Sequence, residues 1–247
     1  MLNNILFFDR IKLMFMEENY KKLDRLFNKY KLSREEINEI MKVIKPIFEH
    51  REFQKRMEKD FLHHSDITLG EHILEDTIVT YRLAKKKKCN VELALKISML
   101  HDLYTSPWQN SERKVKHFFN KHGFTHPLEA VINSYNWFPN LFANEKESKI
   151  IIDGILHHMF PLPVRRINYK ELELNNLALI DNLPSNIKND IIISSKRKRI
   201  KGISFSRSLY KEGKIMSKAD KRVSIRQIKN FYSFTSLFTG KNKSIKK

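Results

Sequence analysis

The chain contains very little cysteine, glycine and proline, and it has no long apolar run. Its 247 residues include one cysteine, Cys89, so no disulfide can form within the chain and packing must hold the fold together. Six glycines and seven prolines are too few for a turn-rich β architecture and favour helices. No apolar segment approaches the ~20 residues that a membrane-spanning helix requires, so we expect no membrane partner.

The first ten residues also lack the features of a secretory signal. They include a short apolar patch, but no basic residues precede it and no small-residue cleavage site follows it. The single cysteine is in keeping with a reducing compartment. We therefore expect a cytoplasmic protein.

The residues that are present predict an all-α fold with one sizeable core. Hydrophobic residues make up 41% of the chain and aromatic residues 11%, which is typical of a folded domain. Apolar residues at helical spacing predict helices over residues 17–30, 33–46, 71–88, 91–103, 125 onward, 146–160 and 217 onward. Ser33 begins a capping box, and Pro46 is expected to end or kink its helix. Segment 91–103 is apolar on nearly every side, which predicts a central helix.

Residues 165–215 depart from this pattern, and we interpret them as a basic, partly irregular insertion before the last helix. The insertion contains a strand-like run, Ile191–Ile193, and the basic run Lys196–Arg199. The whole chain carries a formal net charge of +19, which would attract phosphorylated partners and makes nucleic acid a possible one. A solvated basic loop and a Lys-, Asn- and Ile-rich composition from coding bias are the alternative explanations of that charge.

The candidate chemistry centres on a His-Asp doublet, His101-Asp102, at the end of the apolar segment 91–103. A buried imidazole next to a buried carboxylate needs a partner, and a divalent cation satisfies both, as do hydrogen bonds to neighbouring helices. Further candidate ligands lie on both sides of the doublet: His72, His122, His126, His157, His158 and Asp220. Ligands spread in this way over several helices favour a metal site in the core of a helical bundle.

The predicted helices place these histidines differently. His72 lies in the first turn of its helix, where it can turn inward. His126 lies where a helix begins with Thr125 as a possible N-cap and Pro127 in the first turn, so the helix dipole favours its neutral form. His122, in the preceding loop, has the weaker claim.

Adjacent side chains on a helix point about 100° apart, so we expect one of His157 and His158 to bind and the other to support it. Gly154, one turn earlier, would let a neighbouring helix or ligand approach closely. Either histidine of the pair His63-His64 could point into a site, but a solvated loop is the favoured interpretation.

Taken together, these motifs resemble the HD-domain superfamily of metal-dependent phosphohydrolases, and in particular uncharacterised bacterial members. The resemblance covers about residues 61–238 and rests on Glu71-His72 with Tyr81–Ala84, Met99–Asp102, His122–Pro127 and His157–Leu162. It implies an HD-domain helical bundle of five or more helices over 61–238. Residues 1–60 would then be an N-terminal helical extension packed on the core, and 239–247 a basic tail.

The resemblance also implies a set of metal ligands. One ion would be held by His72, His101, Asp102 and an Asp of the last helix. A second ion, sharing Asp102, would be held by His126 with one or both of His157 and His158. The last Asp is assigned to Asp220, in an Ala-Asp-Lys triplet whose distance the insertion explains. Asp181 has the more usual separation and remains the alternative.

These ligands suit one or two divalent ions, of Mn, Fe, Ni, Co, Zn or Mg, which lower the pKa of bound water toward ~7. The expected activity is hydrolysis of a phosphate ester, mono- or diester, in a nucleotide or another small phosphorylated substrate, with Asp102 and His122 as the catalytic residues. Two alternatives remain open. One is a basic nucleic-acid-associated helical protein with a structural or vestigial metal site, and the other is oxygen chemistry at iron held by the same ligands.

Overall fold

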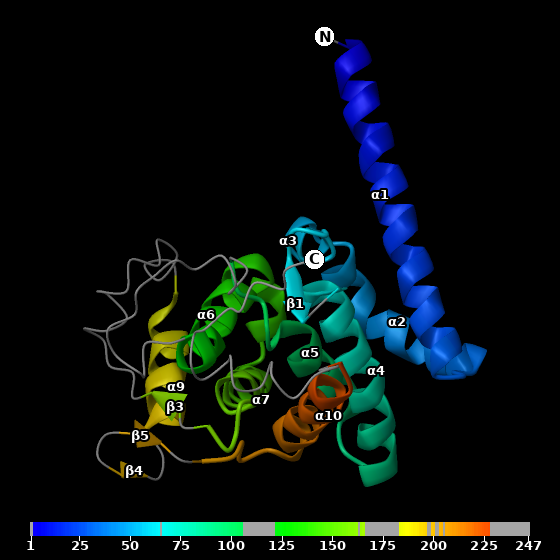
Figure 1. The fold of residues 1–247 in the computed structure, drawn as a ribbon. Helices are drawn as coiled ribbons and strands as arrows, with labels where there is room; N and C mark the ends of the chain where they lie inside the picture. The colour runs from blue at the N-terminus through cyan, green and yellow to red at the C-terminus, as the bar shows by residue number, and fades with distance from the viewer. Residues whose placement is uncertain are drawn as a thin grey trace, which may run out of the picture.

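The computed structural model describes residues 2–64, 66–105, 122–162, 164–165, 183–196, 199–200, 203–204 and 206–227. In this part of the chain the fold is mostly helical, which confirms the all-α prediction (Figure 1). The helices are α1 (Leu2–Lys29), α2 (Arg34–Phe48), α3 (Arg51–Arg56), α4 (Leu69–Lys87), α5 (Val91–Leu100), α6 (His122–Trp137), the 3-10 helix η3 (Pro139–Phe142), α7 (Glu145–Leu156), α9 (Ser185–Ser195) and α10 (Lys211–Gln227).

The described strands are short and antiparallel. Strands β1 (Leu62–His64) and β2 (Ile67–Thr68) form a hairpin directly before α4, with Leu62 opposite Thr68. Strand β5 (Ile203–Ser204) pairs with both β3 (Val164–Arg165) and β4 (Arg199–Ile200). No described helix is both long enough and apolar enough to cross a lipid bilayer.

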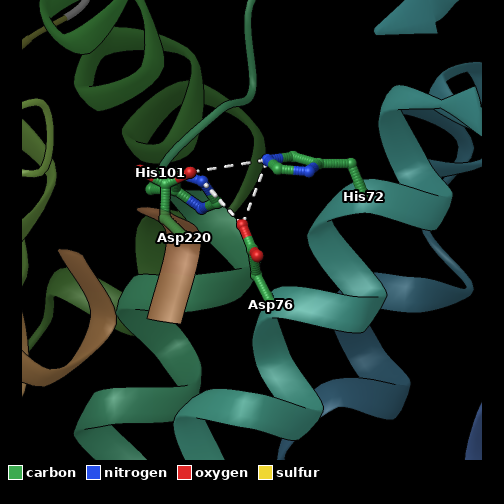
Figure 2. A group of neighbouring side chains, drawn as sticks. All are labelled: His72, Asp76, His101 and Asp220. Carbon is green, nitrogen blue, oxygen red and sulfur yellow. Dashed lines mark ion pairs between the residues drawn. The ribbon is translucent and has the colours of Figure 1, made fainter. Parts of the chain in front are cut away.

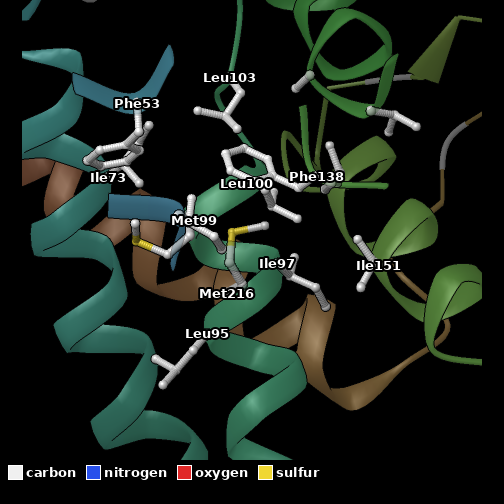
Figure 3. Packing of buried hydrophobic residues seen from close by; sticks show 14 of the residues in the cluster. Phe53, Ile73, Leu95, Ile97, Met99, Leu100, Leu103, Phe138, Ile151 and Met216 are labelled. Atoms are coloured by element: carbon white, nitrogen blue, oxygen red, sulfur yellow. The ribbon is translucent and has the colours of Figure 1, made fainter. Parts of the chain in front are cut away.

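Helix α5 is the central element, as its apolar sequence predicts. It contacts α2, α4, α6, α7 and α10. Ile97, Met99 and Leu100 are fully buried, and Figure 3 shows them surrounded by side chains from neighbouring helices, among them Ile73 and Met216. Each such burial contributes about 1.5–3 kcal/mol, so α5 fixes the position of the His101-Asp102 doublet that follows it.

The N-terminal helices join the same core. Ile40 and Phe48 of α2 and Phe53 of α3 are fully buried and belong to the hydrophobic cluster around α5. Ser33 forms the expected capping box with Glu36, and α2 continues two residues past its internal proline before it ends. The N-terminal end of α1 extends away from the bundle (Figure 1).

A capping box sets the first residue of helix α4, and so the position of His72 in it. Thr68 accepts a hydrogen bond from the Glu71 backbone N–H, and the Glu71 side chain accepts one from the Thr68 N–H, so a capping box starts the helix at Leu69. His72 therefore lies in the first turn, as predicted, and Asp76 lies one turn later. Both side chains are fully buried, so this face of α4 is turned into the bundle.

A close helix crossing positions α10. A Cβ built on Gly213 of α10 would lie 2.7 Å from the Gly154 Cα of α7, and one built on Gly154 would lie 2.8 Å from Ile97. The expected close approach at Gly154 is thus confirmed. Asp153 holds the chain just before α10, because its Oδ2 accepts hydrogen bonds from Ser208 Oγ at 2.6 Å and from the Leu209 N–H at 2.8 Å.

Three boundaries near the candidate ligands differ from the predictions. Helix α5 ends at Leu100 rather than at 103, so His101 and Asp102 lie just beyond it. Helix α6 begins at His122 rather than after Thr125, so Thr125 is no N-cap and Pro127 lies inside the helix. Thr125 Oγ1 instead donates back to the His122 carbonyl at 3.5 Å. Helix α7 ends at Leu156, so His157 and His158 lie just beyond it.

The segment interpreted as an irregular insertion contains more helix than predicted. The run Ile191–Ile193 belongs to α9 and is not a strand. Its apolar residues follow helical spacing when Ile187 is included: Ile187, Ile191 and Ile192 are buried beside α7, whereas Ile193 is 58% exposed. The last helix starts at Lys211, six residues before the expected Ser217.

Candidate metal centre

Side chains from three helical segments meet in the middle of the bundle. His72 and Asp76 come from α4, His101 from the end of α5 and Asp220 from α10, and Figure 2 shows the four converging. One ligand atom from each lies within 4.8 Å of the others, and all four residues are buried. This is a compact set of two imidazoles and two carboxylates.

The distances within this set are short. His72 Nε2 lies 3.1 Å from Asp76 Oδ2 and 3.7 Å from Asp220 Oδ1. His101 Nε2 lies 3.5 Å from the same Asp76 oxygen. Asp102 adds a third carboxylate, because its Oδ2 lies 3.6 Å from His101 Nε2 and 3.9 Å from His72 Nε2.

The other oxygen of Asp102 faces a second pair of imidazoles. Asp102 Oδ1 lies 3.3 Å from His126 Nε2 and 3.4 Å from His158 Nε2. These two nitrogens are 3.0 Å apart. The carboxylate of Asp102 therefore stands between two groups of donors, one on each of its oxygens.

Hydrogen bonds at Nδ1 fix the orientation of the imidazoles. In three of them Nδ1 lies 2.7–2.8 Å from a backbone carbonyl, which can only accept: His101 to Ser98, His126 to His122 and His158 to Ile155. Nδ1 must therefore carry the hydrogen in each ring, and Nε2 is turned into the cluster. This is the arrangement in which metal-binding histidines are held.

His72 is oriented through a side chain instead. Gln227 Nε2 donates to Glu75 Oε2 at 2.8 Å, so the amide oxygen of Gln227 faces His72 Nδ1, also at 2.8 Å. Nδ1 then donates to Gln227, and Nε2 faces Asp76. Lys29 at the end of α1 and Tyr30 just after it donate to Glu75 Oε1, both at 2.7 Å, which connects the N-terminal helix to this support.

The carboxylates differ in their electrostatic surroundings. Burial raises the pKa of Asp76 well above its usual range, although the His72 imidazole opposes this. Burial would also raise the pKa of Asp102, but the imidazoles of His101, His126 and His158 hold it well below the usual range. Asp102 is therefore ionised at neutral pH and can attract cations on both sides.

The imidazoles respond to the same charges. Burial alone would lower the pKa of His72, but Asp76, Asp220 and Asp102 together raise it to about 10. Burial lowers the pKa of His101, only partly opposed by Asp102. In the absence of a cation, one proton on His72 thus offsets part of the carboxylate charge.

The donor set fits a metal ion. Within the described residues, neither oxygen of Asp76 accepts a hydrogen bond, and Asp102 Oδ1 and His101 Nε2 also have no hydrogen-bond partner. Leaving such groups buried and unmatched costs about 1–3 kcal/mol each, and more for charged groups. The two inward nitrogens of His126 and His158 can be 3.0 Å apart only with a proton or a cation between them. A divalent cation on each side of Asp102 would satisfy these atoms, and imidazole with carboxylate suits first-row transition metals.

The structure does not bring His157 into this cluster. Its Nδ1 lies 2.8 Å from the Ser206 carbonyl, and its Nε2 lies 3.2 Å from both the carbonyl and the hydroxyl of Ser194. The α-helix ends before the pair, and His158 alone turns toward Asp102. His157 instead connects the end of α7 to α9 and to the chain before α10.

An aromatic wall lies beside the cluster. The His122 ring stacks on His126 at 4.7 Å and meets the edge of Tyr104 at 4.6 Å. The Tyr104 hydroxyl lies 3.1 Å from His63 Nδ1, and the His63 ring stacks on His72 at 4.1 Å. Burial, followed by the charge of His126, lowers the pKa of His122 to about 3, so His122 is neutral at pH 7.

Sequence reasoning missed two residues of this site. Asp76 lies four residues after His72, so a search for polar residues one helical turn from a candidate ligand would have found it. His63 lies in strand β1, where it stacks on His72, rather than in a solvated loop, and a three-residue strand is too short to show a periodic pattern. Asp181, the alternative to Asp220, lies outside the described residues, as do Arg197 and Lys198 of the basic run.

Comparisons with models of protein families, with curated proteins and with solved structures find no match to this chain. The structure by itself establishes that the described part of the chain is mostly helical and contains a buried His/Asp cluster that could hold one or two metal ions.

Proposed function

We propose that this chain is a metal-dependent phosphohydrolase of the HD-domain type. It would hydrolyse a phosphate ester in a nucleotide or a related small phosphorylated molecule. The observation that carries the proposal is the position of Asp102, with imidazoles within 3.6 Å of each of its oxygens. A shared carboxylate between two donor groups is what a pair of cations requires.

The proposed ligands divide between the two oxygens of Asp102. On the Oδ2 side they are His72, Asp76, His101 and Asp220, and on the Oδ1 side they are His126 and His158. Mn, Fe, Co, Ni and Zn suit these nitrogen and oxygen donors better than Ca, and Mg is also compatible. Cations bound there would supply a hydroxide near neutral pH and neutralise phosphate oxygens.

The residues of the chain contribute orientation and proton transfer. The Nδ1 hydrogen bonds hold the imidazoles in place before anything binds, so little reorganisation is needed. Asp102, held ionised by its neighbours, keeps the two donor groups together. We assign proton transfer to His122 because its ring stacks on His126 at 4.7 Å. Its pKa of about 3 makes the free ring a weak base, so a phosphate anion bound beside it would have to raise that pKa for the ring to accept a proton.

The test combines metal analysis with an activity panel. The purified chain is expected to hold up to two equivalents of a transition metal and to hydrolyse at least one member of a panel of nucleotides, cyclic dinucleotides and p-nitrophenyl esters. Asp102→Asn keeps the shape of the side chain but removes the shared charge. Losing an outer-shell partner of a metal site costs ~10–100-fold, so losing this ligand should reduce turnover by at least about 100-fold.

Asp24→Asn is the matched control, because Asp24 is an exposed residue of α1. It should leave metal content and turnover unchanged. The proposal fails if Asp102→Asn retains full hydrolysis, or if the metal-loaded chain hydrolyses nothing in the panel. His122→Gln tests the proton-transfer role separately: metal content should be retained while the pH profile of turnover changes.

A further inference from the structure

A cavity of about 770 Å³ lies along α10, apart from the metal ligands. Among the described residues its lining is basic and includes no aspartate or glutamate; the basic side chains are Lys87, Arg207, Lys211, Lys214, Lys218, Lys221 and Arg222. Leu83, Phe160, Pro161 and Ile225 provide an apolar part of the wall. A volume of this size suits a ligand as large as a nucleotide.

The cavity and the metal centre lie on different faces of the same elements. On α10, Asp220 reaches the metal ligands, while Lys218, about 200° around the helix, lines the cavity. Just after α7, His158 faces Asp102, while the adjacent His157 lines the cavity. The two sites therefore share a helix and a dipeptide but no proposed metal ligand.

The positive charge in the cavity is not neutralised by the described part of the chain. None of the seven basic side chains forms an ion pair with a carboxylate there, in contrast to Lys29 and Lys96 elsewhere. Instead, Arg207 and Lys221 both lie over the ring of Phe160, 4.5 and 5.4 Å from its centroid. The positive charges of Arg207 and Lys221 therefore lie close together over one ring. An anion bound between them would reduce the electrostatic repulsion between these two side chains.

We propose that this cavity binds a small molecule with a chain of several phosphate groups, at a site separate from the metal centre. A phosphate group carries about two negative charges at neutral pH. The seven cations around this cavity therefore match a run of phosphates better than a single one. A nucleic acid would need an extended groove to follow its backbone, and the basic residues here surround one pocket. The phosphate chain could belong to inorganic polyphosphate or to a nucleoside polyphosphate, which share this chemistry.

The proposal concerns binding only and does not depend on the proposed hydrolysis. Calorimetry on the full chain in a metal-free buffer with a chelator would measure binding of orthophosphate, tripolyphosphate and adenosine triphosphate. Tripolyphosphate should bind at least 10-fold more tightly than orthophosphate. If adenosine triphosphate binds more tightly than tripolyphosphate, the cavity recognises a nucleoside polyphosphate. If the two bind with equal affinity, the cavity recognises the phosphate chain alone.

Variants locate the binding. The double variant Lys87→Gln, Lys218→Gln removes one positive charge from α4 and one from α10, both in the lining of the cavity. It should weaken tripolyphosphate binding at least 10-fold. Lys42→Gln with Lys146→Gln removes two charges from exposed lysines of α2 and α7 and should change it by less than twofold. Asp102→Asn should also retain binding. Thermal melts check that each variant is folded.

Three results would overturn the inference. An equal loss in the control pair would mean that only net charge matters. Loss of binding in Asp102→Asn would place the phosphates at the metal centre. Displacement of tripolyphosphate by a short single-stranded RNA, with tighter binding of the RNA, would favour a nucleic-acid surface.

Discussion

Replacing Gly213 by alanine tests the packing that places Asp220. The added Cβ would lie 2.3 Å from Ser208 Oγ and 2.7 Å from the Gly154 Cα, so both a side chain and a backbone atom block it. Ser208 is itself fixed by its hydrogen bond to Asp153 and cannot easily move aside. The start of α10 must therefore shift away from α7.

The size of the effect follows from two opposing terms. Overpacking of this kind costs about 1–3 kcal/mol, while alanine is better than glycine inside a helix by about 1 kcal/mol. Because the closest carbon contact is with backbone, we expect a net loss of about 1–2 kcal/mol in the free energy of unfolding, measured by urea denaturation. For a chain of this length, each kcal/mol lowers the melting temperature by about 2–4 °C.

A second measurement on the same variant tests whether this packing affects the metal centre. A shift of α10 also moves Asp220, so Gly213→Ala should weaken metal binding, measured by competition with a chelator dye. Gly123→Ala is the matched control, since among the described residues its Cβ would meet Leu162 alone, at an ordinary 3.9 Å, and it should be neutral or slightly stabilising. If Gly213→Ala is as stable as the parent chain and binds metal equally well, the close approach of α7 and α10 is refuted.

Two further outcomes can be measured on the same material. His122 has its pKa lowered to about 3 from an ordinary value of 6.5, so the unfolded chain takes up a proton that the folded chain refuses as the pH falls below 6.5. The free energy of unfolding should then fall with a slope of up to about 1.4 kcal/mol per pH unit between pH 6 and 4, and this part of the slope should be missing in His122→Gln; equal slopes would contradict the burial of this ring. Manganese at 100 times its dissociation constant should raise the free energy of unfolding by about 2.7 kcal/mol, and a chelator should reverse the gain. Asp76→Asn should reduce this gain and Asp24→Asn should not, whereas an unchanged gain in Asp76→Asn would exclude Asp76 as a ligand.

The sequence was most informative where a residue pattern has one physical solution. Segment 91–103 is apolar all round, which leaves only a buried position, and the structure confirms it as the central helix. The capping residues fixed the start of α2, and His72 lies in the first turn of α4 as predicted. Asp220 reaches the cluster although a long, atypical segment precedes it.

The sequence was least informative where tertiary contacts decide the outcome. A run of three isoleucines fits a strand or a helix, and only packing of Ile187, Ile191 and Ile192 beside α7 selects the helix. His157 and His158 are equivalent in sequence. Helix α7 ends just before the pair, which lets their side chains diverge, and that end could not be located from apolar spacing alone.

The ligand set has a consequence for how the protein is made. His72 and Asp76 lie in an early helix, whereas Asp220 and the Gln227 that steadies His72 lie in α10. A growing chain on the ribosome therefore carries an acidic half-site long before its last members are synthesised. The proposed metal site is therefore complete only once α10 has docked, so binding of a cation there would report completion of the bundle.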